Sequence, residues 1–275
     1  MIPFAKAHAC GNDFLIVTEE AVQNRDRAEL TRRLCARNTG IGADGIEFFA
    51  WTGPSSGRIR LHNADGSIAE ISGNGTRCVA AWMALERGFQ PGDELHIETD
   101  AGLRLCRVNA LRTNGEFTVE VTAGMGVPSF APRTVALANG LAVAGVEVST
   151  GNPHFVIAVD DAEFTSNEGY DWQTLGAEIC RHEDFPHQTN VEFLRVVTPT
   201  EIEIRIFERG VGPTSSSGTG SSASATAAIA LGLVKSPVKV VAPGGAQMVE
   251  WDGPGTELRL TGPASLIACG EAWPA

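Results

Sequence analysis

The chain carries one pattern twice, and this duplication limits its possible folds more than any other feature. Each copy has a polar strand end, a glycine-rich turn and then a helix of small residues. The turns are Gly73-Asn74-Gly75 in the first copy and Gly218-Thr219-Gly220 in the second. A repeated supersecondary pattern indicates two related halves. We therefore expect two lobes, each a sheet wrapped around a central helix, with the two helix N-termini facing one cleft between them.

Hydrophobic patterning predicts the remaining elements of the first half. A helix is expected over residues 25–37, ending before the turn Asn38-Thr39-Gly40. Apolar runs and alternation predict strands at 14–17, 46–49, 58–62, 95–99, 103–108 and 117–121.

The domain boundary follows from the duplication. Residues 128–132 contain two prolines and read as a linker. We place the first lobe at residues 1–125 and the second at 126–263. The C-terminal segment 264–275 is short enough to return to the first lobe and complete it.

Composition narrows the class of protein. With 275 residues and 43% hydrophobic content, the chain can bury one large core or two ordinary ones. The formal net charge is −12 and the basic residues are scattered, so we expect no nucleic-acid partner. The first 30 residues do not resemble a signal peptide, and no stretch is apolar for long enough to span a bilayer. We expect a cytoplasmic protein with no membrane partner.

Six cysteines are dispersed without a C-x-x-C pair or histidines at zinc-ligand spacing, so no metal site is expected. In a cytosolic chain such cysteines are best interpreted as buried small hydrophobic residues. They are Cys10, Cys35, Cys78, Cys106, Cys180 and Cys269.

The two glycine-rich turns are candidate anion sites. A helix N-terminus presents unpaired N–H groups beside the positive end of the helix dipole, so the two turns together could hold one carboxylate. Ser72 and Ser217 stand immediately before them. Each serine is either a helix N-cap, which its residue type favours, or a group that faces a shared ligand. Proton transfer at an amino-acid α-carbon needs a base on one face, an acid on the other and a stabilised carbanion carboxylate.

More polar residues surround these turns than a core requires. Any single asparagine is most often a turn residue, and Glu208-Arg209 at a strand end is most often a solvated pair. Together, these polar residues suit the binding of a second amino-acid head group, in which Arg209 would bind the carboxylate and Glu208 the ammonium group. The other members of this set are Asn12, Asn63, Asn152, His154 and Asn190.

Ordered motifs along nearly the whole chain resemble those of the diaminopimelate epimerase family. Gly73-Asn74-Gly75 also distinguishes the chain from proline racemases, which carry Gly-His-Gly there. The remaining matching segments are 8–14 (HACGNDF), 40–45 (GIGADG), 63–66 (NADG), 151–154 (GNPH), 208–212 (ERGVG), 218–220 (GTG) and 243–245 (PGG).

The resemblance implies an α+β fold of two pseudo-symmetric lobes, each a mostly antiparallel sheet around a central helix. It implies a small-molecule amino-acid substrate, no cofactor and a homodimer. His154 and Glu208 match positions that support the catalytic pair. By position, the distal head group of the substrate would be held by Asn63, Asn152, Asn190, Glu208 and Arg209. The reacting head group would be contacted by Asn12, Gly73, Asn74, Gly218 and Thr219.

The chain departs from the family at the catalytic pair, where the resemblance implies two cysteines and the sequence has Ser72 and Ser217. The pKa of a thiol is near 8.5, and that of a hydroxyl is roughly five or more units higher. If this whole difference entered the activation barrier, it would be on the order of 7 kcal/mol, or about 10⁵-fold in rate. The expected function is inversion of LL-2,6-diaminopimelate to the meso form by two-base proton transfer, impaired by the serines. A non-catalytic amino-acid-binding homologue, or an isomerase or dehydratase of a related amino acid, are the alternatives.

Overall fold

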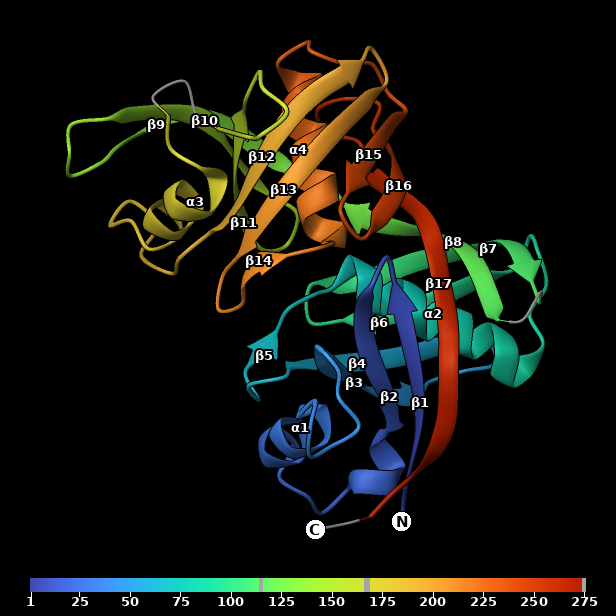
Figure 1. The fold of residues 1–275 in the computed structure, drawn as a ribbon. Coiled ribbons are helices and arrows are strands. Elements are labelled where there is room, and N and C mark those ends of the chain that lie inside the picture. Colours follow the sequence, from blue (N-terminus) through green and yellow to red (C-terminus); the bar gives the residue numbers. More distant parts are fainter. Residues whose placement is uncertain (114–115, 166–168, 274–275) are drawn as a thin grey trace. The chain divides into compact units, whose positions relative to one another are not determined.

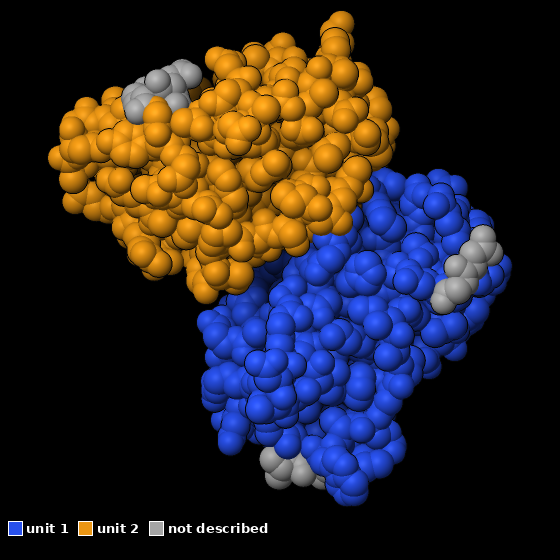
Figure 2. All heavy atoms as spheres, in the orientation of Figure 1, with its two compact units in different colours: residues 1–124, 261–275 blue, residues 125–260 orange. Residues whose placement is uncertain are grey.

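The computed structural model describes residues 1–113, 116–165 and 169–273. These residues form two compact units, shown in blue and orange in Figure 2. Unit 1 contains Met1–Gly124 together with Thr261–Ala275, and unit 2 contains Met125–Leu260. The fold is mixed α+β, and Figure 1 labels its elements. None of the helices in the described ranges is long and apolar enough to cross a membrane.

Unit 1 is a sheet around one long helix, α2 (Gly73–Arg87), with α1 (Arg27–Cys35) and the short 3-10 helix η1 (Glu19–Val22) outside it. The last strand, β17 (Leu258–Ala272), pairs antiparallel with β1, so the C-terminal segment completes this unit. The other strands of unit 1 are β1 (Ile2–Ala9), β2 (Asn12–Thr18), β3 (Gly45–Trp51), β4 (Ser56–Asn63), β5 (Ile68–Ala69), β6 (Glu94–Thr99), β7 (Gly102–Arg112) and β8 (Phe117–Gly126).

Unit 2 has the same plan around α4 (Gly218–Ala230), with α3 (Trp172–Cys180) packed beside β12 and β13. Its strands are β9 (Ser129–Ala136), β10 (Ala142–Ser149), β11 (Pro153–Ala158), β12 (Asn190–Thr198), β13 (Glu201–Glu208), β14 (Gly212–Thr214), β15 (Val238–Ala242) and β16 (Gly245–Glu250).

The strand pairings of one unit repeat those of the other. In unit 1 the successive pairs β1–β2, β2–β3, β3–β4, β4–β6 and β6–β7 are antiparallel, parallel, antiparallel, parallel and antiparallel. The pairs β10–β11, β11–β12, β12–β13, β13–β15 and β15–β16 follow the same order. Corresponding strands therefore deliver corresponding residues to the start of each central helix.

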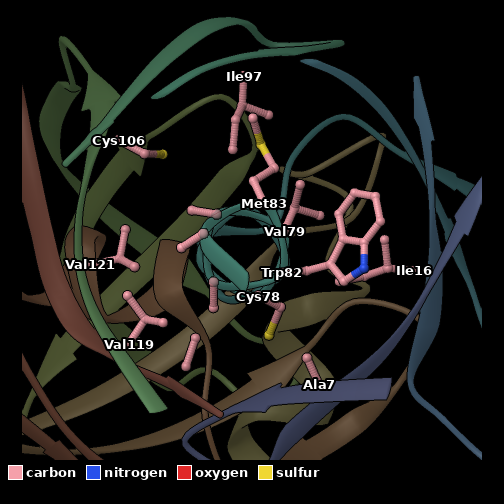
Figure 3. Packing of buried hydrophobic residues seen from close by; sticks show 14 of the residues in the cluster. Ala7, Ile16, Cys78, Val79, Trp82, Met83, Ile97, Cys106, Val119 and Val121 are labelled. Atoms are coloured by element: carbon pink, nitrogen blue, oxygen red, sulfur yellow. The ribbon is translucent and has the colours of Figure 1, made fainter. Parts of the chain in front are cut away.

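The central helices are buried over most of their length, and most of their buried side chains are apolar or small, Asn74 and Arg77 of α2 being exceptions. In unit 1, Trp82 of α2 packs edge-on against Phe49 of β3 with ring centroids 4.9 Å apart. Figure 3 looks along α2 and shows Ile97, Val119 and Val121 from the surrounding strands directed at it. The helix ends at Arg87 and is capped by Gly88, whose φ of 68° is the left-handed conformation that glycine adopts readily. In unit 2, residues 218–228 of α4 are all buried, and each of them is glycine, alanine, serine or threonine.

Three expectations need correction. Residues 128–132 are not a linker, because β9 includes residues 129–136 and Pro132 pairs with Val146 of β10. The first helix is shorter than predicted, since Asp26 caps it by accepting a hydrogen bond from the Glu29 N–H. Five cysteines are buried as expected, but Cys269 is exposed within a run of exposed residues, 267–269, of β17.

Candidate functional site

The two glycine-rich segments form the first turns of α2 and α4 and are not separate turns before them. Ser72 and Ser217 are the N-cap residues. Ser72 Oγ accepts a hydrogen bond of 3.0 Å from the Gly75 N–H, and Ser217 Oγ accepts one of 3.2 Å from the Gly220 N–H. Each serine therefore caps its helix in the structure, which is the more ordinary of its two interpretations. It also fixes each hydroxyl beside the N–H groups of the first helical turn.

Around the start of α2, an asparagine pair joins the β1–β2 hairpin to the helix. Asn74 Nδ2 donates to Asn12 Oδ1 at 3.1 Å, and Asn12 Nδ2 donates to Asp44 Oδ2 at 2.8 Å. The carboxylate of Asp44 is also bound by Arg37 at 2.7 Å. We call the set Asn12, Glu47, Ser72 and Asn74 the α2 cluster. Its asparagines are held in place by these contacts and by Arg77 of the same helix, which donates to Asn74 Oδ1 at 2.7 Å.

Glu47 is the least expected member of the α2 cluster. It lies in the middle of β3 and is fully buried. Neither carboxyl oxygen has a hydrogen-bond partner within the described part of the chain. A Cβ on Gly75 would overlap Glu47 Oε1, so this carboxyl packs directly against the first turn of α2. Burial raises the pKa of Glu47 to about 8, because the charged form loses its hydration.

In unit 2, a chain of hydrogen bonds leads from a buried histidine to Ser217. His154 Nε2 lies 2.9 Å from Asn152 Oδ1, which can only accept, so this nitrogen carries a proton. Asn152 Nδ2 contacts Thr219 Oγ1 at 3.4 Å, and Thr219 Oγ1 lies 3.3 Å from Ser217 Oγ. The opposite ring nitrogen, His154 Nδ1, lies 2.8 Å from Glu192 Oε1. We call Asn152, His154, Glu192, Ser217 and Thr219 the α4 cluster.

The α2 and α4 clusters occupy equivalent places in their units. Glu47 pairs with Ile16 and Leu61 on the neighbouring strands, and Glu192 pairs with Val156 and Ile206 on the equivalent strands. Like Glu47 beside Gly75, Glu192 Oε1 lies against Gly220, 2.7 Å from the place of a Cβ there. The two carboxyls differ in one partner. The β11 position of His154 is taken in β2 by Phe14, which cannot share a proton.

The residues expected at the distal head group fall into two places. Asn190 contacts one other member of this set, because its Oδ1 accepts from the Arg209 N–H at 2.9 Å. Its Nδ2 donates to Pro153 O at 3.1 Å. Glu208 is the last residue of β13, directly before Arg209. Asn63 lies in unit 1, at the end of β4, where its Nδ2 donates to Ser67 Oγ at 3.0 Å. Asn190, Glu208 and Arg209 are thus neighbours of the α4 cluster, through Pro153 and His154.

Glu47 and Glu192 are the two residues that sequence reasoning missed. The ring nitrogens of His154, a residue expected to support the catalytic pair, contact Glu192 and Asn152. The available signal was a glutamate inside each buried strand, at 46–49 and again at 191–194, because an acidic residue is almost never buried without a reason. No group of three or more His, Cys, Asp or Glu residues that could hold a metal ion occurs in the described ranges.

We expect the unfolding free energy to fall less steeply with rising pH in Glu47→Gln than in the wild type. Burial raises the pKa of Glu47 from 4.5 to about 8, so between these values the folded protein retains a proton that the unfolded chain releases. The unfolding free energy should fall across this window by about 1.4 kcal/mol per pH unit for this one group. Denaturant unfolding of both proteins at several pH values measures the difference. His62, whose pKa burial lowers, acts oppositely but equally in both proteins. Parallel slopes would contradict the assignment.

Comparison with known proteins identifies the family. The sequence model of the family described as diaminopimelate epimerase matches residues 4–131 and 146–267. Diaminopimelate epimerase of Corynebacterium glutamicum is 37% identical, with 98% of each chain covered, and that of Prochlorococcus marinus is 35% identical, covering 100% of this chain and 93% of the relative. The chain belongs to the diaminopimelate epimerase family. The expectation of an enzyme of the amino-acid epimerase and racemase type is thereby confirmed.

Solved structures share the fold of this diaminopimelate epimerase family member. A predicted epimerase from Pseudomonas aeruginosa matches with a TM-score of 0.76 at 15% identity, covering all of both chains. A hydroxyproline epimerase from Agrobacterium vitis matches with a TM-score of 0.71 at 16% identity, covering 98% of this chain and 90% of that one. At such identities the likeness concerns the fold alone, and it confirms the predicted α+β class.

Proposed function

We propose that this chain inverts one α-carbon of LL-2,6-diaminopimelate to give the meso form, by two-base proton transfer without a cofactor. In this proposal Ser72 and Ser217 take the places of the family's two catalytic cysteines. The observation that carries the proposal is the matched pair of N-cap serines, each on a glycine-rich first helical turn, in a chain with full-length relatives named diaminopimelate epimerase. The family further suggests a cytoplasmic homodimer in lysine biosynthesis.

The first helical turns suit the carboxylate of the reacting head group. Removal of the α-proton places negative charge on that carboxylate, and N–H groups at a helix start stabilise such charge without having to move. Asn12, Gly73 and Asn74 would serve from unit 1, and Gly218 and Thr219 from unit 2. The asparagine contacts that lock Asn74 support this role, because a fixed donor costs no reorganisation during the reaction.

The residues around β13 suit the distal head group. Arg209 would bind its carboxylate, Glu208 its ammonium group, and Asn63, Asn152 and Asn190 the remaining polar atoms. Asn190 already positions the backbone of Arg209 through a hydrogen bond of 2.9 Å. His154 and Glu208 would support the catalytic pair, and the hydrogen-bond chain from His154 to Ser217 supplies a route for that support.

Exchange of the α-proton with solvent tests the proposal. The protein is incubated in deuterium oxide with LL-diaminopimelate, meso-diaminopimelate, lysine, glutamate and proline, and deuterium at each α-carbon is followed by NMR. We expect slow exchange that is confined to the two diaminopimelate isomers and is abolished in Ser72→Ala with Ser217→Ala. Tight binding without exchange would instead indicate an amino-acid-binding homologue. Exchange that is fastest with another amino acid would contradict the assigned substrate.

A further inference from the structure

We propose that Glu47 holds and returns the proton of Ser72, so that the α2 cluster transfers protons as a serine–carboxyl relay. The proposal rests on the proposed function and assigns a positioning and proton-holding residue to one half of the reaction. The side chain of Glu47 packs against the first turn of α2 and would act on the substrate through Ser72.

The geometry places the carboxyl and the serine against the same glycine. The site of a Cβ on Gly75 is overlapped by Glu47 Oε1 and lies 3.2 Å from Ser72 Cβ. The N–H of the same glycine donates to Ser72 Oγ. Any side chain at this position would push the carboxyl away from the serine. Glycine is therefore required here by the close approach of Glu47 to the first turn of α2.

The carboxyl has no structural partner that would explain its burial. A buried polar group without a hydrogen bond costs free energy, and a buried charge costs much more. Both oxygens of Glu47 lack a partner among the described residues, and its paired neighbours Ile16 and Leu61 are apolar. The titratable group that acts on it from α2 is the thiol of Cys78, whose pKa burial also raises. At neutral pH, Glu47 therefore keeps its proton.

The helix start favours both states of such a relay. Burial holds the proton on Glu47, while the positive end of the α2 dipole stabilises the carboxylate left after the proton is given away. In the α4 cluster, by contrast, Glu192 is paired with His154. Ser72 with Glu47 then forms the donating side of the reaction, and Ser217 with the His154–Glu192 pair the accepting side.

The relay step balances in protons and electrons. The O–H bond of Ser72 breaks, and its proton forms the new C–H bond with the electron pair of the carbanion. Glu47 and Ser72 are not hydrogen-bonded to each other in this structure, so the carboxyl first turns about its side-chain bonds to reach Ser72 Oγ. The O–H bond of Glu47 then breaks in the same step, and its proton moves to that oxygen. The serine is thereby regenerated and Glu47 is left as a carboxylate. In the reverse direction the carboxylate takes the serine proton as Ser72 accepts the α-proton. Because Ser72 never becomes a free alkoxide in this concerted step, only part of the free-energy cost of ionising its hydroxyl adds to the activation barrier.

Glu47→Gln tests the relay, because glutamine preserves the shape of the side chain but cannot exchange the proton. We expect solvent deuterium incorporation at the diaminopimelate α-carbon to fall by about 10²-fold or more, with the Kd for diaminopimelate unchanged. Glu47→Asp should retain part of the activity. Glu98→Gln, an exposed glutamate on β6 of the same unit, is the matched control and should behave as wild type.

A second background separates a proton relay from a structural role. In Ser72→Cys with Ser217→Cys a thiolate carries its own charge, so Glu47→Gln should lower exchange by a much smaller factor there. Equal losses in both backgrounds would overturn the relay. Unchanged exchange in Glu47→Gln would overturn the relay but leave the proposed function standing. Wild-type protein that exchanges no amino-acid α-proton would remove the proposed function and the relay with it.

Infrared titration supplies a readout that does not depend on turnover. The wild type should show a carboxylic acid band at neutral pH that disappears as the pH rises through about 8. The band should be missing in Glu47→Gln and present in Glu98→Gln. Absence of this band in the wild type at neutral pH would mean that Glu47 is already ionised, which would overturn the relay whether or not the variants fold.

Discussion

Replacing both serines by cysteine, as Ser72→Cys with Ser217→Cys, should raise the rate of diaminopimelate epimerisation by up to about 10⁵-fold. The two side chains are nearly isosteric, so the first turns of α2 and α4 should be preserved. The thiol pKa lies roughly five or more units below that of the hydroxyl, and a helix N-terminus lowers it further. A coupled assay for meso-diaminopimelate measures the gain.

The single variants and the pH profile are the controls for this experiment. Ser72→Cys or Ser217→Cys alone should give little of the gain, because inversion needs an acid on one face and a base on the other. The rate of the double variant should increase with pH as the thiolate forms. A double variant that binds diaminopimelate but leaves its α-proton unexchanged over hours would contradict the epimerase assignment.

Arg209→Ala should weaken binding of diaminopimelate by about 2–5 kcal/mol, since it removes a charged fork from the distal carboxylate. Monoamino acids lack the distal head group and should lose much less. Calorimetry with diaminopimelate and lysine measures the two losses. Arg259→Ala is the matched control, because this arginine lies in β17 and pairs with Glu250 at the surface. Equal losses for both ligands would refute the role of Arg209.

The sequence predicted the elements whose signal is local. Strands 46–49 and 58–62 lie inside β3 and β4, because apolar spacing and β-branched residues report burial on a sheet. The duplicated motif indicated the two central helices, and the serines before them are N-caps. We expected the glycine-rich segments to be turns that precede the two helices, but they are helical themselves. Tertiary packing fixes this first helical turn, although glycine on its own disfavours a helix.

The contacts of the clusters could not be predicted from local pattern. Glu47 and Glu192 reach their helices through strand register, which pairs residues that are far apart in sequence. The contact of His154 with Glu192 could not be predicted for the same reason, because Glu192 becomes its neighbour only through the parallel pairing of β11 with β12. The prediction of a linker at residues 128–132 failed because Pro132 is accommodated within β9.

The isotope content of substrate and product most directly tests the central claim that two different groups act on opposite faces of the α-carbon. Wild-type protein at high concentration is given LL-diaminopimelate in deuterium oxide, and the reaction is stopped early. Two-base transfer predicts meso-diaminopimelate with deuterium at the inverted carbon, while the remaining LL isomer keeps its original proton. Product that retains the substrate proton, or deuterium that enters the LL isomer without inversion, would contradict the account.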